Sequence, residues 1–159
     1  MISILNCCSV CFRREGKIEM GKLIVLIGCA KEKCLFKSVA EEIYISPLFR
    51  LSLKYARKLK PDAIFILSAK YGLITLRDEI KSYNITLNKM AAVRRKAWSL
   101  KIIDQLAIDF DLQKDHFIIL AGTRYREFLL PYIASFEIPL YGLPIGKQIQ
   151  FLKQEVEDD

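Results

Sequence analysis

Three short polar segments carry the residues best suited to chemistry, and each directly follows a run of apolar residues. Together they offer a thiol, lysine and arginine cations, phenols, hydroxyls, an amide and carboxylates. The segments are Gly28-Cys-Ala-Lys31-Glu-Lys33, Ser68-Ala-Lys70-Tyr71-Gly-Leu73 running on to Tyr83-Asn84, and Ala121-Gly-Thr-Arg124-Tyr125-Arg-Glu127. Such groups bind phosphates, stack on a nucleobase and hydrogen-bond to its edge. The pattern therefore favours a nucleotide or a nucleic acid as the ligand.

Two other kinds of site receive little support from the sequence. No Walker phosphate loop is present, and the single histidine, His116, starts an apolar run, which is the wrong end of a strand to activate Cys29. The order Cys7-Cys8-x-x-Cys11 resembles half of a zinc site, but no second Cys-x-x-Cys pair completes it. We therefore expect no metal and no cofactor, and a buried structural role for Cys29 beside the substrate.

Positive charge is concentrated in the middle of the chain. The formal net charge is +7; residues 50–101 carry 13 Lys and Arg against three Asp and Glu, whereas residues 102–159 carry five against ten. So basic a segment is typical of proteins that bind the phosphates of a polyanion, although a solvated helix face has the same composition. The predicted contacts to the nucleic-acid backbone are Arg77, Lys81, Arg94, Arg95 and Lys96.

Alternating strands and helices must position these side chains. Unbroken apolar runs at 23–27, 63–67 and 117–120 are typical of parallel strands that are buried on both faces. A weaker strand at 137–140 belongs at an edge because it contains Pro139. Helices are predicted from Ser46-Pro47 to about Leu59, from about Lys89 to Phe110, from about Arg124 to Ala134, and from Pro144 to about Lys153.

The long central helix is predicted to bury one stripe of apolar side chains and to expose its basic residues. The positions in that stripe are Met90, Val93, Ala97, Leu100, Ile103, Leu106 and Phe110. The opposite, exposed face then carries Arg94, Arg95, Lys96 and Lys101.

The alternation predicts an α/β fold with three layers, α/β/α, around a central, mostly parallel sheet of about four strands. We expect one catalytic domain over residues 21–153, an N-terminal extension over 1–20 and a solvated acidic tail over 154–159. The sequence lacks a secretion signal and a membrane-length apolar run, which favours a cytoplasmic protein with reduced cysteines and no membrane contact. Ligands of such sheets collect at the carboxyl ends of the strands, so the three polar segments should meet at one rim.

A resemblance to known proteins extends over about residues 22–152. The motifs that carry it are Cys29-Ala-Lys31-x-Lys33, Tyr44-x-Ser46-x-x-Phe49, Leu67-Ser-Ala-Lys-Tyr-Gly-Leu73, Tyr83-Asn-x-Thr-Leu87, Arg94-Arg-x-x-Trp98 and Ala121-Gly-x-x-Tyr125. They resemble an uncharacterised family of small bacterial and phage domains that is similar to the YaaA stress family, to the archaeosine synthase catalytic domain and to uracil-DNA glycosylase-like folds. Phage-defence DNA glycosylases that remove glucosylated hydroxymethylcytosine resemble the same group. Archaeosine synthase has Pro where this chain has Gly28, and the water-activating motif of uracil glycosylases is absent.

The resemblance implies a DNA glycosylase that flips a modified base out of a duplex and excises it. Asp78, or else Glu127, is predicted to stabilise the oxocarbenium-like sugar, and Lys31 to balance charge on the departing base. The remaining residues predicted to bind the substrate are Gly28, Cys29, Ser46, Ser68, Lys70, Tyr71, Tyr83, Asn84, Arg124 and Tyr125. Two alternatives stay open: a non-catalytic DNA-binding protein of the YaaA type, and a nucleobase or nucleoside transferase. For the glycosylase, DNA is the expected partner, and the sequence indicates no obligate protein partner.

Overall fold

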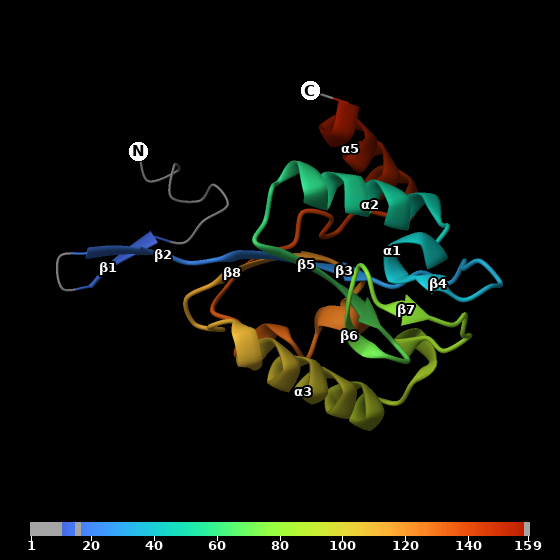
Figure 1. Ribbon diagram of the computed structural model, residues 1–159, viewed down its shortest axis with the longest axis horizontal. Coiled ribbons are helices and arrows are strands. Elements are labelled where there is room, and N and C mark those ends of the chain that lie inside the picture. The colour runs from blue at the N-terminus through green and yellow to red at the C-terminus, as the bar shows by residue number, and fades with distance from the viewer. Residues whose placement is uncertain (1–10, 15–16, 158–159) are drawn as a thin grey trace.

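A five-stranded sheet forms the centre of the computed structural model, which describes residues 11–14 and 17–157 (Figure 1). Its order is β6 (Gly72–Thr75), β5 (Ala63–Ser68), β3 (Leu23–Gly28), β8 (His116–Leu120) and β9 (Ser135–Glu137). Strands β5, β3, β8 and β9 are parallel, and β6 folds back antiparallel on β5. The four parallel strands therefore present their carboxyl ends at one edge.

Strand β3 is the middle strand and is buried on both faces. It pairs with β5 from Ile24↔Ala63 to Gly28↔Leu67 and with β8 from Leu23↔His116 to Ile27↔Leu120. Leu23 to Ile27 are all buried. Because helices cover both faces of a parallel sheet, every side chain of this strand must be apolar, which explains its unbroken run of Leu, Ile and Val.

Helices cover both faces of the sheet, and Figure 1 shows the three layers. Helices α2 (Pro47–Lys58) and α5 (Ile145–Glu157) lie on one face, above a core that includes Val25, Ile27 and Ile118. Helix α3 (Ala92–Asp109) and the short α4 (Thr123–Arg126) lie on the other, above a core that includes Ile24, Leu26 and Ile119. The predicted α/β fold with three layers is thus confirmed, with five strands in the central sheet in place of about four.

Smaller elements surround this sandwich. Strands β1 (Cys11–Arg14) and β2 (Lys17–Met20) pair with each other, as do β4 (Ser38–Val39) and β7 (Glu79–Ile80). Helix α1 (Ala40–Ile43) follows β4, and two single turns of 3-10 helix, η2 (Leu87–Lys89) and η3 (Leu130–Tyr132), complete the chain. No helix in the described part of the chain is long and apolar enough to span a membrane. The segment Cys7-Cys8-x-x-Cys11, where the sequence predicts no metal, lies outside the described residues and side chains.

Helix α2 begins as its sequence predicts. The Ser46 hydroxyl accepts a hydrogen bond from the Phe49 amide at 3.1 Å, and Pro47 occupies the first turn. An N-cap serine with proline at the first helical position stabilises a helix start because one free amide is satisfied and another is absent. The helix ends at Lys58, close to the predicted end at Leu59.

Two predicted helices differ from the structure. The helix expected over 124–134 breaks into α4 and η3, because Pro131 lacks an amide hydrogen and its ring disfavours a continuous helix. Gly122, not Thr123, is the N-cap of α4. Helix α5 continues to Glu157, beyond the predicted end near Lys153, so residues 154–157 of the expected tail are helical; Leu152 is buried in the core.

The predicted buried stripe of α3 is confirmed at Ile103 and Leu106 and is wrong at Val93, Ala97 and Leu100. The buried residues are Arg95, Ser99, Ile102, Ile103 and Leu106, whereas Val93 is 81% exposed. The helix is therefore rotated relative to its apolar pattern. Two polar contacts accompany this rotation: the Arg95 Nε donates to Glu127 Oε1 at 2.7 Å, and the Trp98 Nε1 donates to the Ser68 carbonyl at 2.9 Å.

Matched truncations on α3 test this rotation. Ile102→Ala should lower the free energy of unfolding by about 2–5 kcal/mol because it leaves a cavity in the core. Val93→Ala should change the same quantity by less than about 0.5 kcal/mol, since its side chain is exposed. Denaturant titrations of both variants measure these values, and a large loss for Val93→Ala would contradict the rotation.

Candidate functional site

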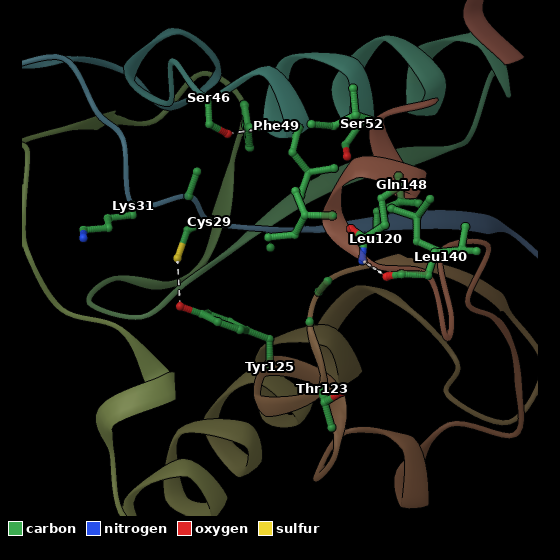
Figure 2. Close-up of a pocket in the computed structure, with 18 of the residues that line it drawn as sticks. Cys29, Lys31, Ser46, Phe49, Ser52, Leu120, Thr123, Tyr125, Leu140 and Gln148 are labelled. Carbon is green, nitrogen blue, oxygen red and sulfur yellow. Dashed lines mark hydrogen bonds between the residues drawn. The ribbon is translucent and has the colours of Figure 1, made fainter. Parts of the chain in front are cut away.

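A pocket of about 680 Å³ opens at the carboxyl ends of β3 and β8 (Figure 2). Its walls come mainly from the segment after β3, the segment after β8, the start of α2, and the start of α5 with the residues before it; Asn88 of η2 also contributes. This edge of a parallel sheet is where ligands of α/β domains bind, because loops and helix N-termini face one crevice there. We take this pocket as the candidate site.

Close approach of the two strand ends requires a glycine. A Cβ atom added to Gly28 would lie 3.1 Å from the Ala121 Cβ and 3.3 Å from its Cα. These distances are tighter than most Cβ contacts in proteins, so a side chain at Gly28 would require Ala121 to shift by a few tenths of an ångström. Gly28 therefore lets the segments that follow the two strands meet in one wall.

The pocket is electropositive from its backbone alone. Helices α2 and α5 both begin at its wall, with Ser46 and Phe49 from the first and Ile145 and Gln148 from the second. Helix N-termini carry partial positive charge and free amide groups. The arrangement favours a ligand with anionic or electron-rich groups.

Cys29 and Tyr125 meet inside the pocket, as Figure 2 shows. The Cys29 thiol donates a hydrogen bond to the Tyr125 hydroxyl at 3.4 Å, and the Leu87 amide donates to the same hydroxyl at 3.4 Å. Burial, with a further contribution from the neighbouring Cys29, raises the pKa of Tyr125 to about 12. Tyr125 is therefore a neutral hydrogen-bonding group at physiological pH.

Polar side chains are placed around the mouth of the pocket. Lys31 and Glu32 follow β3 and are exposed. Among the described residues that line the pocket, Glu32 is the one with a carboxylate. Opposite, the Arg126 guanidinium donates to the Ala121 carbonyl at 2.6 Å and lies 5.6 Å from the ring centroid of Tyr141. A cation, a carboxylate and an apolar interior are thus available to one ligand.

Comparison with known proteins identifies the family. A model described as "Family of unknown function (DUF6884)" matches residues 24–154. The chain belongs to the DUF6884 family. The match includes all five strands of the central sheet except the first residue of β3, and all residues that line the pocket. No curated protein and no solved structure matches the chain.

Five of the predicted site residues of the DUF6884 domain line the pocket together. They are Gly28, Cys29, Lys31, Ser46 and Tyr125. They come from the strand ends and the α2 N-cap, which the apolar runs and the Ser-Pro signal located correctly. His116 starts β8 at the opposite end of the sheet from Cys29, so a Cys/His pair does not form.

The two carboxylates predicted to be catalytic do not line the pocket. Asp78 is exposed in the turn between β6 and β7, and its Oδ2 accepts a hydrogen bond from the Thr75 amide at 2.9 Å. Glu127 pairs with the buried Arg95 at 2.7 Å and lies 3.9 Å from Arg124. The expectation that Asp78 and Arg124 meet Lys31 at one rim is therefore not met. An acidic residue in a tight turn or an ion pair is common, and sequence alone does not separate these roles from catalysis.

The residues expected to read a base lie next to the pocket and not in its wall. Ser68 is buried; its hydroxyl donates to the Tyr83 hydroxyl at 2.9 Å and accepts from the amides of Lys70 and Tyr71. Tyr83 in turn shares a 2.7 Å hydrogen bond with the Tyr44 hydroxyl. Asn84 is exposed beyond this network.

All but one of the predicted backbone contacts are exposed. Arg77, Lys81, Arg94 and Lys96 are exposed, but Arg95 is only 7% exposed and is engaged by Glu127. Arg95 is therefore a structural residue, contrary to the prediction. Because α2 and α3 cover opposite faces of the sheet, the basic residues of segment 50–101 do not form one continuous surface.

Polar pocket residues outside the predicted set include Glu32, Asn88 and Gln148. Glu32 stands between Lys31 and Lys33 in the first polar segment, so the composition of that segment was a usable signal. Asn88 and Gln148 come from elements whose contact with the site depends on the tertiary fold, and nothing in their local sequence indicates it.

A pH series tests the placement of Tyr125. The folded protein keeps this phenol protonated up to its pKa of about 12, whereas an unfolded tyrosine ionises near pH 10. The resulting stabilisation is complete below about pH 10 and is lost as the pH rises to about 12. Tyr125→Phe should lower the free energy of unfolding by about 1–3 kcal/mol at neutral pH, because the Leu87 amide loses its partner.

The difference between wild type and Tyr125→Phe should then shrink across that alkaline window. Denaturant titrations at a series of pH values measure it, with Tyr132→Phe as a control because Tyr132 is 42% exposed. A difference that stays constant from about pH 9 to pH 12 would show that this phenol is not buried.

Proposed function

We propose that this protein is a DNA glycosylase that excises a modified base and leaves an abasic site. The observation that carries the proposal is the composition of the pocket: the first turns of α2 and α5, together with Lys31 and Glu32, line one cavity of about 680 Å³. N-glycosidic cleavage needs a cavity for the base, a cation for the leaving group and an anion for the sugar.

The size of the pocket supports a base that carries a bulky substituent. Its volume lies within the range of about 300–1,000 Å³ typical of small-molecule sites. An unmodified pyrimidine is far smaller than this space, whereas a glucosylated hydroxymethylcytosine would occupy more of it. Ser46, Asn88 and Gln148 offer hydroxyl and amide groups that suit the hydroxyls of a sugar.

Lys31 and Glu32 each have a distinct role in the proposed reaction. The flipped nucleotide places its base in the pocket and its sugar at the mouth. As the bond between C1′ and the base nitrogen breaks, its electron pair passes to the base, and the Lys31 ammonium stabilises the negative charge that develops there. The Glu32 carboxylate stabilises the cationic sugar and accepts a proton from the water whose oxygen bonds to C1′. That proton then neutralises the released base.

Tyr125 and Cys29 act as neutral contacts inside the pocket. Because the pKa of Tyr125 is raised to about 12, its hydroxyl is protonated and can hydrogen-bond to a base without adding charge. Asp78 and Glu127 have no catalytic role in this proposal. Asp78 bonds to the Thr75 amide within a turn, and Glu127 pairs with Arg95.

The test compares DNA duplexes that contain normal, hydroxymethylated or glucosylated cytosine, with alkali cleavage as the readout for abasic sites. We expect wild type to cleave a modified substrate. Glu32→Gln should lower the rate by at least about 10²-fold, because the sugar cation loses its counter-charge. Lys31→Gln should also slow base release.

Two carboxylate variants provide matched controls. Asp78→Asn and Glu127→Gln should retain the wild-type rate at temperatures where they stay folded, since neither side chain lines the pocket. Absence of abasic sites on every duplex would rule out the glycosylase. Duplex binding without any product would favour the DNA-binding alternative, and exchange of a labelled free base would favour a transferase.

A further inference from the structure

A cluster of tyrosine rings and lysine side chains lies beside the pocket, at the carboxyl end of β5. We call it the tyrosine–lysine cluster, and its members are Lys33, Tyr44, Lys70, Tyr71 and Tyr83. The rings of Tyr71 and Tyr83 meet edge to face, with 5.6 Å between their centroids. Hydroxyl contacts fix both rings: Tyr83 through Ser68 and Tyr44, and Tyr71 through the Lys81 carbonyl at 3.4 Å.

The three rings contact two lysines. The Lys33 ammonium lies 4.3 Å from the ring centroid of Tyr83 and 5.7 Å from that of Tyr44. The Lys70 ammonium lies 5.2 Å from the ring centroid of Tyr71. Cation–π contact restricts a lysine side chain that would otherwise be mobile. The cluster therefore presents two oriented positive charges.

These charges have no ion-pair partner among the side chains that the structure describes. Among residues 21–157, no carboxylate pairs with Lys33 or Lys70; Glu79, the acidic residue of β7, pairs with Lys37 instead. Lys33 donates to the Lys31 carbonyl at 3.2 Å, which leaves further donors of the ammonium available. Partial burial lowers the pKa of Lys33, and the nearby Cys29 opposes this shift in part.

The cluster is continuous with the pocket. Lys33 directly follows Lys31 and Glu32, which line the mouth. The Cys29 thiol lies between the two regions, since it bonds to Tyr125 in the pocket and also contributes to the raised pKa of Tyr83 in the cluster. A ligand that fills the pocket and extends past its mouth on the β5 side would therefore reach Lys33 and then Lys70.

We propose that Lys33 and Lys70 bind two backbone phosphates of the DNA strand whose base occupies the pocket. The proposal rests on the proposed function, because it takes that same DNA as the ligand. Phosphate is the anion that a polynucleotide offers at regular intervals along a strand, and oriented cations without carboxylate partners match it. The two lysines thereby set the position of the strand relative to the pocket.

The salt dependence of DNA binding tests this inference. A short fluorescent duplex is titrated with the full chain at several salt concentrations, and log Kd is plotted against log salt concentration. Lys33→Gln and Lys70→Gln should each reduce the slope by about 0.9, and the double variant by about 1.8, because each lysine neutralises one phosphate. Lys101→Gln, an exposed lysine on α3, is the matched control and should leave the slope unchanged.

A second variant tests the role of the rings. Tyr71→Leu keeps the Lys70 charge but removes the surface that orients it, so affinity should fall several-fold while the slope stays within about 0.3 of wild type. Slopes for Lys33→Gln and Lys70→Gln that equal the wild-type slope would overturn the inference. Competition by inorganic phosphate that matches competition by unlabelled DNA at equal phosphate concentration and constant ionic strength would overturn it too, because the sites would then take single phosphates.

The outcome is separable from that of the glycosylase test. Abasic sites formed by wild type, together with unchanged slopes for both lysine variants, would support the glycosylase proposal and contradict the phosphate contacts. Reduced slopes without abasic sites on any duplex would support the phosphate contacts and contradict the glycosylase proposal.

Discussion

Parallel pairing of β3 with β5 and β8 is the constraint from which the rest of the structure follows. Because β3 is hydrogen-bonded on both sides, the ends of three strands reach the same edge of the sheet in register. Chains that leave parallel strands must cross over and return through helices, so both faces are covered. The same geometry aims the N-termini of α2 and α5 at that edge, where a fixed positive potential results before any lysine is counted.

A site at such an edge depends on how closely the neighbouring strand ends approach. The contact between Gly28 and Ala121 brings the segments after β3 and β8 into one wall. Cys29 and Tyr125 then meet across that wall, and the Leu87 amide joins η2 to the same hydroxyl. Gly28 thus connects the register of the sheet to the shape of the pocket, whose wall is built on the ends of buried strands.

Local pattern was sufficient to predict the layers and the edge that carries the site. The unbroken apolar runs predicted β3, β5 and β8, and Ser46-Pro47 predicted the start of α2. Pattern failed where a polar side chain is satisfied by a distant partner. The orientation of α3 follows from contacts of Arg95 and Trp98 with residues about 30 positions away, and such pairings leave no periodic trace in the sequence. Glu32 is the acidic residue that lines the pocket, because Asp78 is bonded within a local turn and Glu127 pairs with Arg95.

The contrast between Arg95 and the lysines of the tyrosine–lysine cluster shows how the fold divides its charges. Arg95 is buried, and its guanidinium bonds to Glu127 and the Met90 carbonyl, so its charge serves to join α3 to the end of α4 and is shielded from a ligand by burial. Lys33 and Lys70 rest on aromatic rings, which orient a cation without neutralising it. A cation without a counter-charge lowers stability where it is desolvated. Contact with an aromatic ring compensates part of this lost solvation. A protein that binds a polyanion gains from this second arrangement, because the positive charge is already in place when the phosphate arrives.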